Sequence, residues 1–401
     1  MADTKNTTNK TFEYRIRPNK KFVAACEKAL GDSRFVYNCA LEQRIRVYNA
    51  SGKTISFYEQ SRQLTQARDE LPKIKSALRT IQSDALERLD EAFIAFFKRL
   101  KAGQKLGFPR FKSRDRYHTF SQKYEKVRPC PIKGDKLTVP GVGTCRIRLS
   151  RPVEGRCKQL RITRRADGWY VLLVCETPKP APLAPSGQTV GVDVGIKSFA
   201  TLSTGEEIAN PRHLKQAADQ LAREQRRLAR KVKGSQNRGK ARGKVALRHL
   251  RVQRARKHFH HKEAAKLVER FDRIAVEDLN IRGMVKNHRL AKAILDVAWG
   301  QFFAITKSKA ESAGRTFERV NPRYTSQTCS NCGHKQKMPL AIRVYECEKC
   351  GFVCGRDHNA AINLDSVRAS GPEPEACGER KRSKKQERNG SSQSEPRRGG
   401  D

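Results

Sequence analysis

The sequence predicts a multidomain protein of mixed α/β and β class, and three observations support this. Short β-patterned runs near residues 12–18 and 136–175 enclose a long stretch with helical spacing. A proline-rich linker at residues 178–185 precedes a second half in which strand-like and helical runs alternate. Two CxxC pairs near the C-terminus add a small cysteine-bound module. A chain of 401 residues is long enough for about two to four domains.

The first half is expected to be a small β-rich module interrupted by helices. Residues 12–18 alternate apolar and polar side chains like a strand, and helical spacing begins at residue 19. Within the helical pattern of residues 64–100, five apolar side chains recur at intervals of three and four, which predicts a core-facing stripe. They are Leu86, Leu89, Phe93, Phe96 and Phe97. Strands are predicted again at residues 137–139, 159–163 and 169–174.

One segment of the first half has two interpretations. Residues 107–120 interleave aromatic and cationic side chains around Pro109. Such a segment can stack bases while it pairs with phosphates, but a loop with ordinary buried aromatic side chains would have the same composition. Both interpretations remain open on the sequence alone.

The second half begins with a strand-like run at residues 189–200. Its period of two places Val190, Val192 and Val194 on one face and Asp193 on the other. A second predicted strand, residues 274–276, ends at Glu277, and a helix at 293–313 and a strand at 316–320 follow. After the cysteines, Asp357, Ala360, Ala361 and Leu364 share one face of a predicted helix.

A strongly basic stretch lies between these strands. Residues 212–262 contain eighteen Lys or Arg against two acidic residues, with leucines at heptad spacing before a glycine-rich break at 234–243. We interpret this stretch as two helices in a basic hairpin. A solvated charged face is the alternative, but so one-sided a balance would repel itself unless phosphates lay nearby.

The overall charge predicts a polyanionic partner. The chain carries 84 Lys and Arg against 41 Asp and Glu, a formal net charge of +43. This charge far exceeds what solubility requires and favours nucleic acid as the partner. No apolar run approaches the roughly 20 residues that span a bilayer. We therefore expect no membrane association and no small-molecule substrate.

The N-terminus and the cysteines predict an intracellular protein. Residues 1–10 are polar and lack the apolar core of a signal peptide. Eight of the twelve cysteines lie outside the CxxC pairs without the spacing of a disulfide framework, which fits reduced thiols in a cytosol.

The two CxxC pairs predict a zinc ribbon. Cys329, Cys332, Cys347 and Cys350 form a C-x2-C pair, a fourteen-residue gap and a second C-x2-C pair, and four thiolates suit tetrahedral zinc. A closed four-thiolate shell has no open coordination position, so this zinc is expected to stabilise the fold and not to react. Cys354 could replace Cys350 as the fourth ligand, although the symmetric pairs favour Cys350.

Three carboxylates suggest a divalent-metal cluster. Asp193 and Glu277 lie on predicted strands and Asp357 lies at the start of a predicted helix. Oxygen ligands on rigid elements suit Mg2+, and two such ions can clamp the attacking and leaving oxygens of a phosphodiester. Each residue alone would be typical of a surface charge. The order D, E, D also differs from that of strand-transfer enzymes, in which the glutamate comes last.

A histidine pair offers a weaker nuclease motif. His258, Phe259 and His260 spell the HUH pattern of single-strand nucleases. That motif requires a strand, because on a helix residues i and i+2 point apart. We therefore expect no catalytic role for this pair.

Several segments in fixed order resemble the TnpB family, formerly called OrfB transposases. They are GVDVGIK at residues 191–197, VEDLNIRGM at 276–284, YTSQTCSNCG at 324–333 and CGFVCGRDHNAA at 350–361. The phrases at residues 107–113 and 34–38 fit the same family. The resemblance covers roughly residues 12–364.

The resemblance implies a transposon-encoded, RNA-guided DNA endonuclease, ancestral to the type V CRISPR effectors. Asp193, Glu277 and Asp357 would match the three carboxylates of an RNase H-like RuvC domain, which would hydrolyse DNA with two Mg2+ ions, or Mn2+ in their place. The four cysteines would hold one structural Zn2+. The implied partners are a guide RNA derived from the transposon end and double-stranded target DNA, in a prokaryotic cytoplasm and associated with the nucleoid.

The resemblance also implies a domain plan. A β-barrel-like wedge domain would carry a helical recognition insertion, and together these would read a short transposon-adjacent motif. The residues that read the motif cannot be assigned individually. The expected domains are the wedge (1–19 and 106–180), the recognition domain (20–105), a linker (181–185), the RuvC-like nuclease (186–323 and 355–369), the zinc-ribbon target-nucleic-acid-binding insertion (324–354) and a disordered tail (370–401) that is nearly devoid of apolar residues.

Two other functions are weighed against the nuclease. A catalytically silent RNA-guided repressor would not need its carboxylates, yet all three matching positions are acidic. A transposase that catalyses strand transfer fits poorly with the D, E, D order and with the lack of a credible HUH motif. Retention of the transposon by cutting of its emptied donor site rests wholly on the resemblance.

Overall fold

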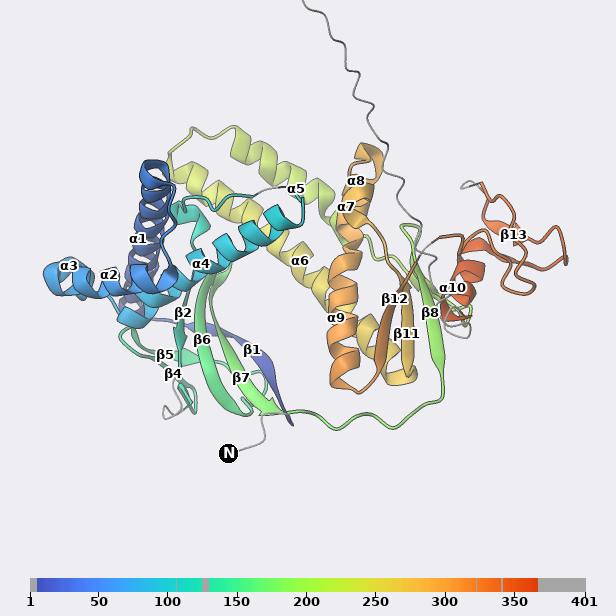
Figure 1. Ribbon diagram of the computed structural model, residues 1–401, viewed down its shortest axis with the longest axis horizontal. Helices are drawn as coiled ribbons and strands as arrows, with labels where there is room; N and C mark the ends of the chain where they lie inside the picture. Colours follow the sequence, from blue (N-terminus) through green and yellow to red (C-terminus); the bar gives the residue numbers. More distant parts are fainter. Residues whose placement is uncertain (1–5, 106, 125–129, 322, 340–341, 367–401) are drawn as a thin grey trace, which may run out of the picture. The chain divides into compact units, whose positions relative to one another are not determined.

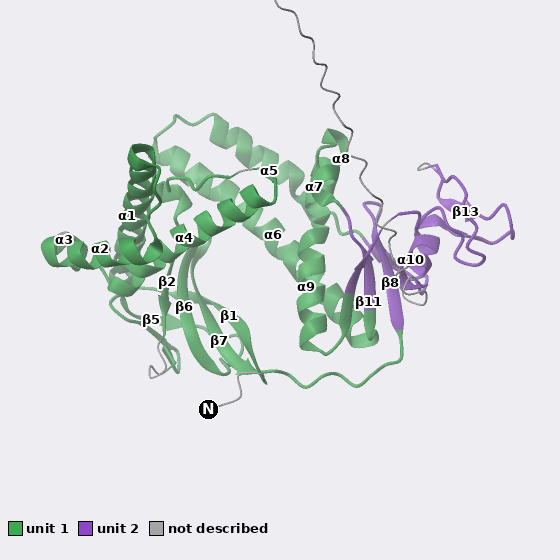
Figure 2. Ribbon diagram, in the orientation of Figure 1, with its two compact units in different colours: residues 1–188, 210–273, 280–317 green, residues 189–209, 274–279, 318–401 purple. Residues whose placement is uncertain are grey.

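The computed structural model describes residues 6–105, 107–124, 130–321, 323–339 and 342–366. These residues form two compact units (Figure 2). The first unit contains residues 1–188, 210–273 and 280–317, and the second contains residues 189–209, 274–279 and 318–401. The predicted disordered tail at 370–401 lies outside the described residues. The predicted domain boundaries divide the chain differently from these units and stay a prediction.

A seven-stranded sheet forms the β part of the first unit. Its strand order is β2-β6-β7-β1-β5-β4-β3, and neighbouring strands run antiparallel. The alternation predicted for the first strand is confirmed, because Phe12, Tyr14 and Ile16 are buried. The strand extends further towards the N-terminus than predicted. The strands are β1 (Thr7–Arg17), β2 (Thr119–Lys123), β3 (Ile132–Lys133), β4 (Lys136–Val139), β5 (Gly143–Ile147), β6 (Arg156–Arg165) and β7 (Gly168–Pro178). The three later predicted strands are confirmed as β4, β6 and β7.

Four helices interrupt this sheet between β1 and β2 (Figure 1). They are α1 (Lys20–Ser51), α2 (Phe57–Glu70), α3 (Pro72–Lys75) and α4 (Arg79–Lys101), and a short 3-10 turn follows at Arg114–Arg116. The Asn19 side chain caps α1 by accepting a hydrogen bond from the backbone of Phe22 at 2.8 Å. The predicted stripe on α4 is core only in part. Leu86, Leu89 and Phe93 are buried, whereas Phe97 is 42% exposed.

The basic stretch forms the predicted helical hairpin. Helices α5 (His213–Ala229) and α6 (Gln236–Arg270) lie side by side in Figure 1. The predicted glycine-rich break was too long, because α6 already begins at Gln236 and includes Gly239 and Gly243. The Ser235 side chain starts the helix by accepting a hydrogen bond from Arg238 N at 3.1 Å, and this cap offsets part of the roughly 1 kcal/mol that each helical glycine costs.

The helix predicted at residues 293–313 is two helices. After α7 (Ile281–Met284), helix α8 (His288–Val297) ends at Ala298, whose φ of 53° is left-handed, and α9 (Trp299–Ser312) begins next to it. The Asp296 carboxylate accepts hydrogen bonds from Leu214 N and pairs with Arg256 at 3.0 Å. These tertiary contacts fix the end of α8, and apolar periodicity carries no signal for them. Among the described residues, no helix combines the length and apolar character that a bilayer span needs.

A five-stranded sheet with the order β10-β9-β8-β11-β12 lies at the centre of the second unit. Val190, Val192 and Val194 of β8 are buried, as the alternation predicted, and Asp193 is half-buried. A two-stranded hairpin and one helix complete the unit. The elements are β8 (Thr189–Val194), β9 (Ser198–Leu202), β10 (Glu207–Ala209), β11 (Arg273–Glu277), β12 (Thr316–Val320), β13 (Val344–Glu346), β14 (Val353–Gly355) and α10 (Arg356–Ser366).

Helix α10 lies directly against β8. A Cβ added at Gly191 would overlap the carbonyl oxygen of Ala361 and lie 2.8 Å from the backbone nitrogen of Asp365, so only glycine permits this approach. The Ser203 hydroxyl accepts from Gly191 N at 3.1 Å and donates to the Asp365 carboxylate at 3.2 Å. Leu364 adds an apolar contact by packing with side chains of β11 and β12. These contacts fix the helix on the sheet.

Gly191→Ala should loosen α10. The added methyl group cannot coexist with the Ala361 carbonyl, so we expect a loss of about 1–3 kcal/mol in stability. Hydrogen exchange of the α10 amides and the thermal midpoint Tm measure this loss. The control is Gly239→Ala, where a methyl group meets nothing within 4 Å and helix propensity should improve. Equal exchange rates in the two variants would contradict the assigned contact.

Candidate functional site

The second unit brings together the three carboxylates that the sequence singled out. Asp193 lies on β8, and Glu277 is the last residue of the neighbouring strand β11. Asp357 is the second residue of α10, which the close approach at Gly191 places on β8. The charges of Glu277 and Asp357 both raise the pKa of Asp193, and the charge of Asp357 also raises the pKa of Glu277. Residues from three separated segments therefore share one site.

Burial and mutual repulsion make this site electrostatically unfavourable without a cation. Burial raises the pKa of Asp193 well above its usual range, the charges of Glu277 and Asp357 raise it further, and Arg356 opposes them. Burial also raises the pKa of Glu277, although a hydrogen bond from the Thr325 hydroxyl at 2.9 Å partly offsets the effect. Hard oxygen donors in such a setting suit a divalent cation such as Mg2+.

Asp357 lies at the more exposed side of the site. Its side chain is 36% exposed and pairs with Arg356 at 3.1 Å and Arg343 at 3.7 Å. Within the described part of the chain, the four cysteines are the only group of three or more ligand side chains whose donor atoms all lie within 4.8 Å of one another. The three carboxylates are thus neighbours but not gathered that tightly.

Two asparagines of α10 connect this site to the cysteine module. The Asn363 amide donates to the carbonyl oxygens of Thr325 at 2.8 Å and Thr328 at 2.7 Å. The Asn359 amide donates to Thr328 O at 2.7 Å and its oxygen accepts from Ser330 N at 2.9 Å. Both asparagines are buried. Sequence reasoning missed them, although two asparagines four residues apart on one helix face were a signal for paired polar contacts.

The four predicted cysteines come together in the structure. Their sulfur atoms lie within 4.8 Å of one another, with Cys329 and Cys350 at 3.7 Å and Cys332 and Cys347 at 3.6 Å. Cys354 is not part of this group and packs, half-buried, against it. The geometry therefore favours Cys350 over Cys354 as the fourth ligand. Four converging sulfurs fit a tetrahedral soft-metal site.

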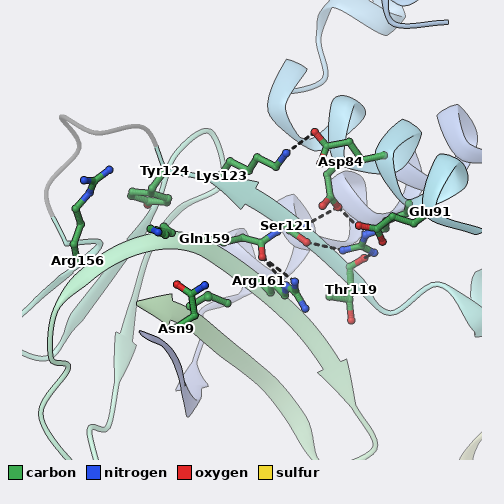
Figure 3. A pocket seen from close by; sticks show the side chains of 14 residues that line it. Asn9, Asp84, Glu91, Thr119, Ser121, Lys123, Tyr124, Arg156, Gln159 and Arg161 are labelled. Carbon is green, nitrogen blue, oxygen red and sulfur yellow. Dashed lines mark hydrogen bonds and ion pairs between the residues drawn. The ribbon is translucent and has the colours of Figure 1, made fainter. Parts of the chain in front are cut away.

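A second candidate surface lies in the first unit, where α4 faces β2 and β6 (Figure 3). Its cavity has a volume of about 710 Å³ and a mixed polar lining. The Asp84 carboxylate pairs with Arg88 at 2.9 Å and accepts from Ser121 N at 3.2 Å, while Arg88 also donates to the Ser121 hydroxyl. Gln159 and Lys123 add polar groups nearby. Such a lining can hydrogen-bond to base edges as well as to phosphates.

The segment at residues 107–120 contains both exposed and buried aromatic side chains. Phe108 and Phe111 are exposed, whereas Tyr117 and Phe120 are buried. The Asn38 side chain exchanges two hydrogen bonds with the Lys112 backbone, at 3.0 and 2.9 Å, and fixes the segment to α1. The buried rings belong to the core, and Phe108 packs edge-on against Phe93 and Phe96. Base stacking by the exposed rings stays a prediction.

The histidines of the HUH pattern do not form a pair. Both lie on α6, where His258 is exposed and His260 is buried with its Nε2 3.0 Å from the carbonyl oxygen of Val297. The expectation that they do not act together is consistent with this placement.

Family comparisons match three parts of the chain. A family described as "Probable transposase" matches residues 172–288, one described as "Cas12f1-like, TNB domain" matches 299–364, and one described as "Helix-turn-helix domain" matches 6–53. In the structure, the last of these ranges holds strand β1 and the single long helix α1.

Relatives of known name match nearly the whole chain. A "Putative RNA-guided DNA endonuclease" of Streptomyces pristinaespiralis is 36% identical over 92% of this chain and 91% of its own length. InsQ of Escherichia coli K12, which has the same description, is 28% identical over 92% of this chain and 94% of its own length. Among solved structures, the Cas12f1–sgRNA–target DNA complex aligns with a TM-score of 0.59 and 15% identity, covering 90% of this chain and 99% of that chain. This last likeness concerns the fold.

The raised pKa of Asp193 predicts a pH-dependent cost of stability. An unfolded aspartate ionises near pH 4, so the folded protein should lose stability as the pH rises from about 4 through the raised pKa of Asp193. Without divalent metal, Asp193→Asn should therefore have a Tm about 2–4 °C higher than wild type at pH 7.5, with the difference shrinking towards pH 4. Thermal denaturation of the two proteins in a chelator, at pH 7.5 and near pH 4, measures the Tm difference and its dependence on pH.

The control is Asp278→Asn. Asp278 is exposed and pairs with Arg319 at 3.3 Å, so its replacement should change the Tm little at either pH. A lower Tm for Asp193→Asn at pH 7.5 would contradict the electrostatic description of the site.

Proposed function

Because the chain belongs to the TnpB (OrfB) family, we propose that it is an RNA-guided DNA endonuclease with a single cutting site in its second unit. The observation that carries this proposal is the meeting of Asp193, Glu277 and Asp357 in one half-buried site. Burial and neighbouring negative charge raise the pKa of Asp193 and Glu277, and a bound divalent cation would offset the cost of ionising them. The relatives that match nearly all of the chain carry the same activity in their names.

The proposed chemistry is phosphodiester hydrolysis in Mg2+, with Mn2+ as a possible substitute. In such sites a pair of divalent ions supplies activation of water and neutralisation of charge on the phosphate. Asp193, whose ionisation depends on both other carboxylates, would hold these ions together with Glu277 and Asp357. The Thr325 hydroxyl orients Glu277, and Arg356 and Arg343 hold Asp357 at the open side, where the DNA strand would enter.

The domain assignments follow the same proposal. The five-stranded sheet with α10 would be the RNase H-like RuvC nuclease, at residues 186–323 and 355–369, and residues 324–354 the zinc-ribbon insertion. The seven-stranded sheet would be the wedge domain, and α1 to α4 the recognition insertion. The likeness of the fold to Cas12f1 in its complex supports this plan.

The proposed partners are a guide RNA from the transposon end and double-stranded target DNA. The net charge of +43 and the basic helices α5 and α6 suit backbone contacts along a heteroduplex, in which base pairing supplies the specificity. The polar cavity between α4, β2 and β6 would read the short flanking motif (Figure 3). The place of action would be the cytoplasm, on the nucleoid.

One structural Zn2+ completes the proposal. Cys329, Cys332, Cys347 and Cys350 would hold it as a closed shell that stabilises the ribbon. Since the same ribbon is hydrogen-bonded to Asn359 and Asn363 of α10, loss of the metal should also loosen the surroundings of Glu277.

The two alternatives are less well supported. A silent repressor has no use for three carboxylates that meet in one half-buried site. A strand-transfer mechanism that depends on the HUH histidines is disfavoured, because His258 is exposed while His260 is buried.

Replacing Asp193 should separate cutting from binding. With the guide RNA of its own locus, Asp193→Ala should lose cleavage of a matched plasmid by at least about a thousandfold, because it removes a metal ligand. Guided DNA binding should stay within about threefold of wild type, because no phosphate contact is lost. Single-turnover cleavage and filter binding measure the two quantities. The control Asp278→Ala should cut like wild type, and undiminished cleavage by Asp193→Ala would remove the metal-site assignment.

Replacing one cysteine should disrupt folding before it affects chemistry. Cys332→Ser removes one of four converging sulfurs, so the purified protein should lose its zinc and much of its solubility. The matched control is Cys354→Ser, which lies outside the cluster and should keep one zinc ion per chain. Elemental analysis and size-exclusion chromatography measure both. A well-folded, zinc-free and inactive Cys332→Ser protein would contradict a structural metal.

A further inference from the structure

Tyr324, next to the proposed nuclease site, has a strained backbone. Its φ of 65° lies in the left-handed region, which costs a residue with a bulky side chain about 1–2 kcal/mol. Strain of this kind persists only where the surroundings hold it, and it concentrates at functional sites. The conformation of Tyr324 therefore requires contacts that hold it in place and indicates a functional role.

Hydrogen bonds to the Tyr324 carbonyl and to the next residue hold the strained residue. The Tyr324 carbonyl accepts from the backbone of Gln327 and Thr328, both at 2.9 Å. The next residue, Thr325, is buried. Its hydroxyl donates a hydrogen bond to Glu277, and its backbone carbonyl accepts one from the Asn363 amide at 2.8 Å. Because Thr325 is bound to Glu277 and to α10, the adjacent Tyr324 is fixed beside the proposed cutting site.

The tyrosine ring is directed outwards in spite of this anchoring. It is 53% exposed, so burial of the ring does not offset the backbone strain. The Lys335 ammonium lies 4.6 Å from the ring centroid. A backbone bridge between Thr328 and Lys335 ties this lysine to the same anchored turn. An aromatic face and a cation are thus held together at the surface. They lie next to Thr325, which donates a hydrogen bond to Glu277.

We propose that Tyr324 and Lys335 form a nucleobase-binding subsite for the DNA strand that is cut. A base of that strand stacks on the ring, and Lys335 pairs with the adjoining phosphate. This inference rests on the proposed function and goes beyond it, since it assigns a residue that positions the strand and holds no metal. Stacking accepts every base, which suits a nuclease whose specificity lies in base pairing. The strand must be single there, because bases within a duplex stack on each other.

Aromatic and aliphatic replacements of Tyr324 distinguish base stacking from a purely structural role. Tyr324→Leu should slow single-turnover cleavage of a guide-matched target about tenfold, whereas Tyr324→Phe and Tyr324→Trp should stay within about twofold of wild type. Leucine and phenylalanine have the same backbone restriction, so strain alone affects them equally. Tyr324→Gly separates strain from function: its Tm should rise while its cleavage falls with that of Tyr324→Leu.

The role of Lys335 is tested by comparing its substitution with that of a neighbouring lysine. Lys335→Gln should slow cleavage about threefold or more at moderate salt, because one phosphate contact is lost. The matched control is Lys337→Gln, since Lys337 is also exposed and no aromatic ring contact joins it among the described residues. Equal rates for the two variants would overturn the part of the proposal that concerns Lys335.

A fluorescent base reports the stacking directly. In complexes of the Asp193→Ala protein with guide RNA and target, 2-aminopurine is placed in turn at each position around the mapped cut. One position should be quenched, and the quenching should disappear when Tyr324→Leu is added and return with Tyr324→Trp. If wild-type protein cuts the target but Tyr324→Leu and Tyr324→Phe cut equally and no position depends on Tyr324, the subsite is overturned alone. If wild type does not cut, the proposed function is overturned together with the subsite.

Discussion

The approach of α10 to β8 at Gly191 is the contact on which the site depends. Without a Cβ at this position, the helix backbone can lie directly on the strand. That placement determines where Asp357 lies with respect to Asp193, and where Asn359 and Asn363 meet the start of the cysteine module. One glycine thus positions a carboxylate and two amides whose partners are distant in sequence.

The carboxylate site and the basic hairpin differ in the sign of their charge. The second unit concentrates three carboxylates, two of which have a raised pKa because of burial and mutual repulsion. The chain as a whole carries a net charge of +43, and the hairpin of α5 and α6 is rich in arginine and lysine. The acidic site favours cations, while the basic helices favour phosphates. A nuclease requires both features at once, because the metal ions and the substrate have opposite charges.

Local patterns predicted the parts of this protein that depend on neighbours in sequence. The alternation around Asp193, the strand ending at Glu277 and the spacing of the four cysteines all correspond to what the structure contains. Tertiary partners determine the rest. The left-handed Ala298 splits a predicted helix because contacts of Asp296 fix the end of α8, and Ser235 starts α6 before two glycines that looked like a break. The strain at Tyr324 depends on Glu277 and α10, and no periodicity could have indicated it.

We propose that this chain cuts DNA chosen by a guide RNA, with divalent metal at the three carboxylates. The most direct measurement is plasmid cleavage by the protein co-purified with RNA from its own locus, using a guide-matched target beside a randomised flank, in Mg2+ and in a chelator. Plasmids with one particular flanking motif should disappear in Mg2+ and persist in the chelator. Guide-dependent binding to the same plasmids with no loss of any of them in Mg2+ would contradict it and would leave a repressor.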